Sequence, residues 1–370
     1  MKKTLLTICL VWMCFSLSAQ KIIDLSGKWS FSIDRQDNGE KEKWFSHTLN
    51  DFINLPGSMP EKLKGDEVTA KTQWTGSLYD SSYYYNPYME KYRKEGNIKF
   101  PFFLTPDKHY VGAAWYQKEV NIPADWKGER ILLFLERPHI ETTVWVNGQK
   151  TGMQNSLCVP HQYDITHYVR PGKCTITIRV DNRIKEINVG PDSHSITDQT
   201  QGNWNGIVGR ICLQTTPKTY FDDIQIYPEP EQKLARVKVV IKGTGTAKVK
   251  LSAESFNTDK KHIVPAIQQE IKLNKGVTET EMVLPMGNDM LLWDEFHPAL
   301  YKLKAEVTNG KKTEIKEIQF GMRRFEIKGK WFYVNGRKTQ LRGTVENCDF
   351  PLTGYAPVSY THLTLPTNRE

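Results

Sequence analysis

The sequence predicts an all-β fold made of two successive β-sandwiches and the start of a third unit. Three observations lead to this prediction: helical periodicity is scarce, short runs alternate apolar and polar residues, and Asn-Gly pairs interrupt two of these runs. A length of 370 residues suits two or three domains. The composition, 39% hydrophobic and 25% charged, is typical of a globular protein.

The N-terminus has the pattern of a secretory signal peptide, residues 1–19. Lys2 and Lys3 form a basic start, "TLLTICLVWMCFSL" is an apolar run, and the small residues of "SAQ" suit cleavage after Ala19. The apolar run is too short to span a membrane as a helix. We therefore expect delivery to the periplasm or the extracellular space, with no membrane span and no lipid anchor.

Residues 20–218 are expected to form the first sandwich. The run "ERILLFLE" is typical of a buried strand, and "KCTITIRVDNR" places Ile176 and Ile178 on one face of another strand. Between them, "HIETTVWVNGQKTG" alternates and then turns at Asn147-Gly148. This pair tolerates the positive φ angles of a two-residue hairpin turn, so the segment predicts a β-hairpin.

A long insertion interrupts this sandwich from about Gly65 to Gly112. It is rich in tyrosine, glycine, proline and charge, and loops of this length are uncommon unless they are functional or disordered. Its aromatic content argues against disorder. We expect a folded excursion that shapes a binding face, and Trp74 in "TQWTG" is a candidate for stacking on a sugar ring.

Residues 219–321 are expected to form an immunoglobulin-like sandwich, because strand-like runs recur there at intervals of about 10–15 residues. A third unit begins at residues 322–357. Its "FEIKGKWFYVNGRKTQLRGT" contains a second hairpin signal, at Asn335-Gly336. The following "TQLRGT" is expected to be a strand that leads into a polar loop.

Other function classes receive little support from the residues. No run of lysine and arginine indicates nucleic-acid binding, although the formal net charge is +8. No cysteine or histidine spacing indicates zinc, and no cofactor is expected. The mature chain would keep Cys158, Cys174, Cys212 and Cys348, for which buried free thiols and a Cys158–Cys174 disulfide are the two alternatives.

Several segments together resemble glycoside hydrolase family 2, which contains β-galactosidases, β-glucuronidases and β-mannosidases. In chain order they are "DLSGKWSFSID", "INLPGSM", "AAWYQKEVNIP", "VWVNGQKTG", "NWNGIVGRICL", "LLWDEFHPALYKLKAEV" and "FGMRRFEIKGKWFYVNGRKTQLRGT". The resemblance implies a jelly-roll sugar-binding domain, an immunoglobulin-like domain and a (β/α)₈ TIM barrel. It also implies hydrolysis of β-linked glycosides with retention, by two glutamates on later barrel strands. Only the first barrel strand is expected in this chain, so the fragment alone should be inactive.

The resemblance also directs attention to two segments that would contact an oligo- or polysaccharide with a β-linked sugar. The first is "GPDSHSITDQTQGNWNG", a loop that the family sends toward the active site, and the second is "RGTVENCDFPLTG", after the expected barrel strand. The candidate sugar-contacting residues in them are His194, Asp198, Asn203, Trp204, Asn205, Arg342 and Asn347. Asn347 and Cys348 stand where the family's His-Glu would fall, a departure from a β-galactosidase-like subsite.

Two alternatives and two local interpretations complete the predictions. A stand-alone carbohydrate-binding protein would use the sandwich without chemistry, and a surface-adhesion pair of sandwiches would not require the "VNGRKTQLRGT" segment. The adjacent carboxylates Asp294 and Glu295 are interpreted as part of a turn or strand end rather than as a catalytic pair. Residues 358–370 match nothing that a barrel requires, and we expect them to be a non-native tail.

Overall fold

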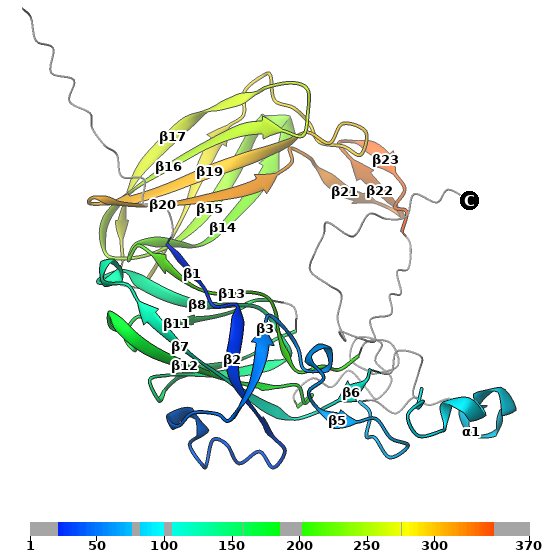
Figure 1. Ribbon diagram of the computed structural model, residues 1–370. Coiled ribbons are helices and arrows are strands. Elements are labelled where there is room, and N and C mark those ends of the chain that lie inside the picture. The colour runs from blue at the N-terminus through cyan, green and yellow to red at the C-terminus, as the bar shows by residue number, and fades with distance from the viewer. Residues whose placement is uncertain are drawn as a thin grey trace, which may run out of the picture. The chain divides into compact units, whose positions relative to one another are not determined.

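The computed structural model describes residues 21–75, 82–99, 106–157, 159–185, 202–274 and 276–343. Within these residues the chain forms two compact units, Lys21–Thr216 and Pro217–Arg342 (Figure 1). Strands make up nearly all of the regular structure, so the predicted all-β fold is confirmed for the described part of the chain. No helix among these residues is long and apolar enough to cross a membrane.

The described residues of the first unit contain two large antiparallel sheets, together with a separate two-stranded ribbon (Figure 1). One has the strand order β1-β13-β8-β11, with β4 also paired to β13: β1 (Ile22–Asp24), β4 (Gly57–Ser58), β8 (Arg130–Pro138), β11 (His161–Asp164) and β13 (Gly206–Thr216). The other has the order β10-β9-β12-β7-β2-β3: β2 (Gly27–Asp34), β3 (Asp51–Leu55), β7 (Ala113–Ile122), β9 (Glu141–Val146), β10 (Gln149–Asn155) and β12 (Gly172–Asp181). Short 3₁₀ helices connect some of them: η1 (Trp44–Ser46), η2 (Pro60–Lys62) and η4 (Ala124–Trp126).

Alternating side chains of both sheets build one apolar core. Leu133 and Leu213 come from the first sheet, while Phe31, Ile176 and Ile178 come from the second. Since each such side chain contributes about 1.5–3 kcal/mol when it is fully buried, this core explains why the alternating runs become strands. The opposite face of the second sheet is also covered, by a separate aromatic cluster: Trp44, Phe45, Leu49, Trp115 and Trp145.

Both predicted hairpins are present. Asn147 and Gly148 have φ angles of 50° and 77° at the turn between β9 and β10, which is the conformation that a two-residue turn requires. Asn335 and Gly336 have the same pair of angles between β22 (Trp331–Val334) and β23 (Arg337–Thr339).

The second unit is a sandwich of a three-stranded and a four-stranded antiparallel sheet. The first is β14 (Tyr220–Glu229), β15 (Leu234–Lys242) and β18 (Val277–Pro285), joined partly by η5 (Pro230–Gln232). The second has the order β17-β16-β19-β20: β16 (Gly245–Phe256), β17 (Ile263–Leu273), β19 (Leu300–Asn309) and β20 (Lys312–Phe320). A sandwich of three and four strands is the arrangement expected for an immunoglobulin-like unit.

A small three-stranded sheet follows, with β21 (Phe325–Lys328) paired to β22 and β22 paired to β23. Of the predicted barrel strand "TQLRGT", only Thr339 lies in a strand, and residues 340–343 have no regular structure. The remainder, from residue 344 onward, lies outside the described residues. The barrel strand therefore stays a prediction.

Two of the four mature cysteines lie among the described residues. Cys174 and Cys212 are buried and free, as the thiol alternative predicts, so Cys174 does not form a disulfide with Cys158. Burial raises the pKa of the Cys174 thiol to about 11, which leaves it protonated and unreactive at neutral pH. Cys158 and Cys348 lie outside the described residues.

Candidate functional site

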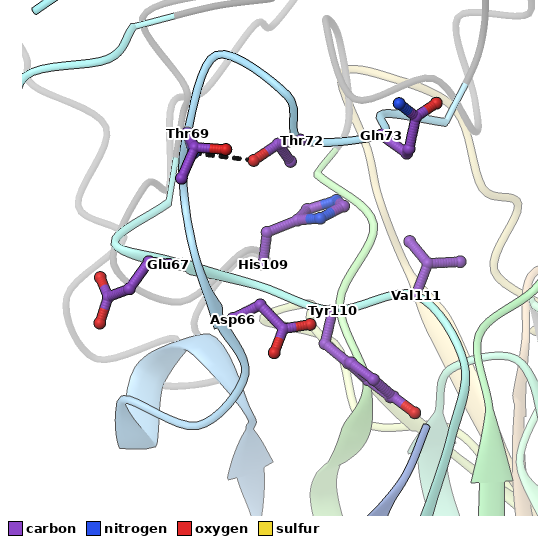
Figure 2. Close-up of a pocket in the computed structure, with 8 residues that line it drawn as sticks. All are labelled: Asp66, Glu67, Thr69, Thr72, Gln73, His109, Tyr110 and Val111. Atoms are coloured by element: carbon purple, nitrogen blue, oxygen red, sulfur yellow. Dashed lines mark hydrogen bonds between the residues drawn. The ribbon is translucent and has the colours of Figure 1, made fainter. Parts of the chain in front are cut away.

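A pocket of about 310 Å³ lies at the base of the long insertion in the first unit (Figure 2). This volume lies at the lower end of the range of about 300–1,000 Å³ that is usual for small-molecule sites. The lining residues are Asp66, Glu67, Thr69, Thr72, Gln73, His109, Tyr110 and Val111. They come from the two chain segments that enter and leave the insertion, which lie some forty residues apart in the sequence.

A two-stranded ribbon joins these segments. β5 (Asp66–Glu67) runs antiparallel to β6 (Lys108–His109), with Asp66 opposite His109. Gly65 precedes the ribbon with a φ angle of +123°, and a Cβ at this position would lie 3.0 Å from the carbonyl oxygen of His109. Only glycine fits such a close approach without strain, so Gly65 allows the insertion to close on itself.

The two carboxylates of the pocket are both paired with cations. Asp66 accepts hydrogen bonds from Arg35, at 2.5 Å from Nη2 and 3.2 Å from Nε. Glu67 forms an ion pair with Lys108, its neighbour across the ribbon. Because successive side chains of a strand point to opposite sides, the two carboxylates do not face one common point.

Hydroxyl and amide groups form another wall. The Thr72 hydroxyl accepts a hydrogen bond from the backbone amide of Thr69 at 2.9 Å, which holds the turn between them, and Gln73 follows directly. Figure 2 shows Thr72 and Gln73 across the pocket from the segment that carries His109, Tyr110 and Val111. Such a set of hydroxyl, amide and carboxylate groups beside aromatic rings can hydrogen-bond a polyhydroxylated ligand.

Two buried asparagines hold the wall that contains His109 and Tyr110. Asn182 accepts a hydrogen bond from the Gly112 amide at 2.8 Å and donates to the Tyr110 carbonyl at 2.8 Å. Asn205 donates to the carbonyls of Gly112 and Val180, at 2.9 and 3.0 Å. The Tyr116 hydroxyl donates a hydrogen bond to the side-chain oxygen of Asn205 at 2.7 Å. Asn205 is fully buried, and its side-chain amide links the Gly112 segment to β12, so it presents no polar atom at the pocket surface.

Asn203 connects the segment that enters the insertion, at Thr75, to Asn182. Its amide nitrogen donates to the Thr75 hydroxyl at 3.0 Å and to the Asn182 carbonyl at 3.1 Å. The neighbouring Trp74 ring lies 4.5 Å from the His109 ring, centroid to centroid, in a tilted arrangement. Trp74 thus lies beside a residue of the pocket, and Asn203 fixes the chain next to it.

The remaining predicted site residues lie elsewhere. Trp204 is buried and stacks on His139 with 4.6 Å between ring centroids. Arg342 is exposed and belongs to the second unit. His194, Asp198 and Asn347 lie outside the described residues.

An ion-paired cluster stabilises the strand end from which Asn182 extends. Asp181 is fully buried and binds Arg179 at 2.9 Å, Arg183 at 2.6 Å and Lys185 at 2.7 Å. Burial acts to raise the pKa of Asp181, but the hydrogen bonds from Arg183 and Lys185 and the charge of Arg179 outweigh it and hold the pKa well below its usual range. The carboxylate therefore stays charged and fixes the end of β12.

Sequence reasoning missed most of the pocket. Asp66, Thr72, Gln73 and His109 are separated in the chain from the predicted Asn203, and no motif connects them. The available signal was the insertion itself, whose predicted limits, Gly65 and Gly112, bracket the ribbon that forms the pocket. Among the described residues, no group of histidine, cysteine and carboxylate side chains is arranged to hold a metal ion.

The fold and the site define a class: a β-sandwich that carries a polar pocket, followed by a second β-sandwich of a three-stranded and a four-stranded sheet. Comparison with family models agrees with this class. Residues 22–217 match the sugar-binding domain of glycosyl hydrolases family 2, and residues 219–323 match a second domain described as glycosyl hydrolases family 2. The chain belongs to glycosyl hydrolases family 2.

Individual relatives are glycoside hydrolases. The chain is 23% identical over 355 residues to a β-glucuronidase of Paenibacillus borealis, which covers 90% of this chain and 51% of the relative. It is 23% identical over 369 residues to the β-glucuronidase of Homo sapiens, covering 90% and 49%. It is 24% identical over 339 residues to the β-galactosidase large subunit of Latilactobacillus sakei, covering 89% and 51%. The chain thus spans about half the length of these relatives.

Solved structures show the same fold. A β-glucuronidase from Ruminococcus gnavus in complex with D-glucuronic acid has a TM-score of 0.59 at 19% identity, covering 88% of this chain and 50% of that one. An uncultured Clostridium sp. β-glucuronidase has a TM-score of 0.58 at 21% identity, covering 87% and 48%.

Proposed function

We propose that the protein is a secreted, retaining β-glycoside hydrolase, of which these residues supply the sugar-binding and immunoglobulin-like domains. The observation that carries the proposal is the pair of consecutive family matches over residues 22–217 and 219–323. Relatives named β-glucuronidase and β-galactosidase, each about twice as long as this chain, support it.

The first unit contributes sugar recognition in this proposal. The polar pocket at the base of the insertion supports this role, with the Trp74 ring beside it. We propose that Asn203 and Asn205 act by positioning the pocket walls, because their amides hold the chain around Thr75 and Gly112. Sugar contacts by His194, Asp198, Trp204, Arg342 and Asn347 are proposed on the family resemblance.

The catalytic carboxyls are proposed to come from a (β/α)₈ barrel, of which "TQLRGT" would be the first strand. Retaining hydrolysis needs two carboxyl groups about 5–5.5 Å apart, one to protonate the leaving oxygen and one to attack the anomeric carbon. Asp66 and Glu67 do not suit these roles, because they point to opposite sides of a strand and pair with Arg35 and Lys108.

Asp294 and Glu295 do not suit the catalytic roles either. Asp294 accepts hydrogen bonds from the Phe296 and His297 amides, both at 2.8 Å, and Glu295 pairs with Arg337. Desolvation would raise the pKa of Asp294, but these two hydrogen bonds and the neighbouring His297 side chain together outweigh it and lower the pKa. This geometry agrees with the prediction that the pair belongs to a turn.

The test is hydrolysis of a panel of aryl β-glycosides, including glucuronide, galactoside, glucoside and mannoside, by the protein with its barrel. We expect one of them to be cleaved, and proton NMR should show that the first product retains the β configuration. The 370-residue chain alone is expected to be inactive on the same panel. Inversion, or turnover by the 370-residue chain, would contradict the proposal.

Secretion is tested separately. The "TLLTICLVWMCFSL" segment supports export. Expression with the native N-terminus should give a mature protein that starts at Gln20 in the periplasm or the medium, as measured by intact mass. Recovery of an uncleaved cytoplasmic chain would show that residues 1–19 do not direct export.

A further inference from the structure

The insertion carries a small lobe with three exposed tyrosines. The lobe consists of α1 (Ser82–Tyr85) and η3 (Pro87–Tyr92), together with the segment that continues to residue 99. The side chains of Tyr84, Tyr85 and Tyr88 are 57%, 72% and 85% exposed. Three large aromatic residues this close together on a surface indicate a contact site rather than random exposure.

Internal contacts hold the backbone that presents these rings. Tyr83 is buried, and its hydroxyl donates to the Tyr92 carbonyl at 2.7 Å. Asn86 caps η3 by accepting a hydrogen bond from the Tyr88 amide at 3.0 Å. The Asn97 amide donates to the Lys91 carbonyl at 2.8 Å. The rings are therefore displayed on a defined scaffold, which lowers the conformational entropy that binding would cost.

The composition of the lobe distinguishes among possible partners. Within residues 82–99 the exposed large hydrophobic side chains are the three tyrosines, while Ile98 is buried, Met89 is half-buried and no leucine, valine or phenylalanine occurs. A surface that enters a membrane would need such aliphatic groups. A tyrosine ring, in contrast, offers a flat apolar face together with a hydroxyl, which suits the apolar face and the hydroxyl rim of a pyranose.

The charge of the lobe favours an acidic ligand. Its cationic side chains outnumber its carboxylates: Lys91, Arg93, Lys94 and Lys99 against Glu90 and Glu95. The Lys91 ammonium lies 4.8 Å from the centre of the Tyr92 ring, so charge and aromatic surface are adjacent. Lys94 and Glu90 form only a loose exposed pair at 3.6 Å, which a ligand carboxylate can compete with.

We propose that this lobe, residues 82–99, binds a polymeric glycan that contains uronic acid residues. Tyr84, Tyr85 and Tyr88 would stack on successive sugar rings, while Lys91 and Lys94 would pair with carboxylates of the polymer. The inference rests on the proposed glycosidase function and extends it, because it names a polyanionic carbohydrate as the class of polymer that the protein binds. Polygalacturonate, which is α-linked, serves as a probe of this binding and not as a substrate. It concerns binding, so it can be tested without turnover.

The experiment measures binding of the 370-residue chain to soluble polygalacturonate and to a neutral mixed-linkage β-glucan, by affinity electrophoresis and calorimetry. We expect binding to polygalacturonate that weakens as salt is raised, since exposed charge pairs are screened. The triple variant Tyr84→Ala/Tyr85→Ala/Tyr88→Ala should bind about tenfold more weakly or worse. Tyr227→Ala is the matched control, because this tyrosine is 47% exposed in the second unit.

Two further variants separate stacking from charge. The triple Tyr→Phe variant at the same positions should keep most of the affinity, whereas Lys91→Gln/Lys94→Gln should weaken binding to polygalacturonate and reduce its salt dependence. Unchanged affinity in the triple alanine variant, with unchanged circular dichroism, would overturn the proposal. Equal binding of the neutral glucan would overturn the acidic class.

Other outcomes remain distinguishable. Self-association of the chain that the triple alanine variant abolishes, without polygalacturonate binding, would show that the lobe contacts protein and would refute the glycan proposal. Failure of the barrel-containing protein to hydrolyse any aryl glycoside would refute the proposed function, while polygalacturonate binding by the lobe would still stand. Hydrolysis without such binding would refute only the inference about the lobe.

Discussion

The two sandwiches differ in what they bury. The first unit buries charged and amide groups at the ends of its strands, among them Arg179, Asp181, Asn182, Asn203 and Asn205. In the described part of the second unit, the buried polar side chains are all threonines, and apolar residues fill the rest of the core. The second unit needs only hydrophobic packing, whereas the first also has to hold a long insertion in place.

This difference shows where a pocket acquires its rigidity. A buried polar group costs free energy unless it is hydrogen-bonded, so such groups persist where their directional bonds have a use. Here Asn182 and Asn205 fix the segment from Tyr110 to Gly112, and Asn203 fixes Thr75. The pocket walls are loop segments, and the amides attach them to the sandwich.

The comparison predicts that Asp181→Asn causes the largest loss in the free energy of unfolding. This change removes the buried carboxylate that Arg179, Arg183 and Lys185 share. Asp37 and Glu141 still pair with Arg179, so we expect a loss at the lower end of the about 3–5 kcal/mol that breaking a buried pair typically costs. The measurement is urea unfolding followed by tryptophan fluorescence, with hydrogen exchange to locate the loss. Glu317→Gln, an exposed acid of the second unit, is the control. A loss below about 1 kcal/mol would mean that the cluster does not support the first unit.

Leu303→Ala is the corresponding test of the second unit. Leu303 is fully buried in its core, and such truncations cost about 2–5 kcal/mol. Hydrogen exchange should rise across β16, β19 and β20 and stay nearly unchanged in β12 and β13. Equal loosening of both units would show that they do not unfold separately.

Acid should destabilise the first unit in two stages. Burial lowers the pKa of His161, and the hydrogen bond to the Ser156 carbonyl opposes this only partly. Because the unfolded chain then binds a proton more readily than the folded chain does, the free energy of unfolding decreases as the pH falls below about 6.5. The lowered pKa of Asp181 gives stability that is complete above about pH 3.9 and is lost as the pH falls further. Urea midpoints at pH 7.5, 5.5 and 3.5 measure this, and His161→Gln should remove the first stage while leaving the second.

Asn203→Ala should produce a smaller and more local effect. It removes the hydrogen bonds to Thr75 and Asn182, worth about 1–2 kcal/mol together. Faster amide exchange is expected at residues 66–75, with little change in β12. If residues 66–75 are unaffected, Asn203 does not position this wall of the pocket.

Lys302→Ala is expected to change the free energy of unfolding least. Lys302 precedes Leu303 in β19, but its side chain is exposed. Its ammonium group lies 3.6 Å from the Glu317 carboxylate. Such surface pairs contribute about 0–1 kcal/mol. This variant is also the control for Leu303→Ala, because the two positions differ in burial and share a strand. A large loss in the urea midpoint would contradict the view that the second unit depends on its apolar core.

The sequence allowed the strands and turns to be predicted but not the pocket. The alternation of Ile176 and Ile178 and the Asn147-Gly148 turn are local patterns, and both are confirmed. Hydrogen bonds such as Asn203 to Thr75 join residues 128 positions apart, and no local pattern encodes them. The stacking of the Trp204 ring on the His139 ring is of the same kind, because it joins two segments that lie far apart in the sequence.

The sequence by itself therefore determined the all-β class, the hairpins and the approximate limits of the insertion, because periodicity and turn chemistry act over a few residues. It also carried the ordered motifs of the family. Only the tertiary structure decided which polar residues brace the fold and which line the pocket. That choice depends on which strand ends and loops come together, and this is set by the packing of the whole sandwich.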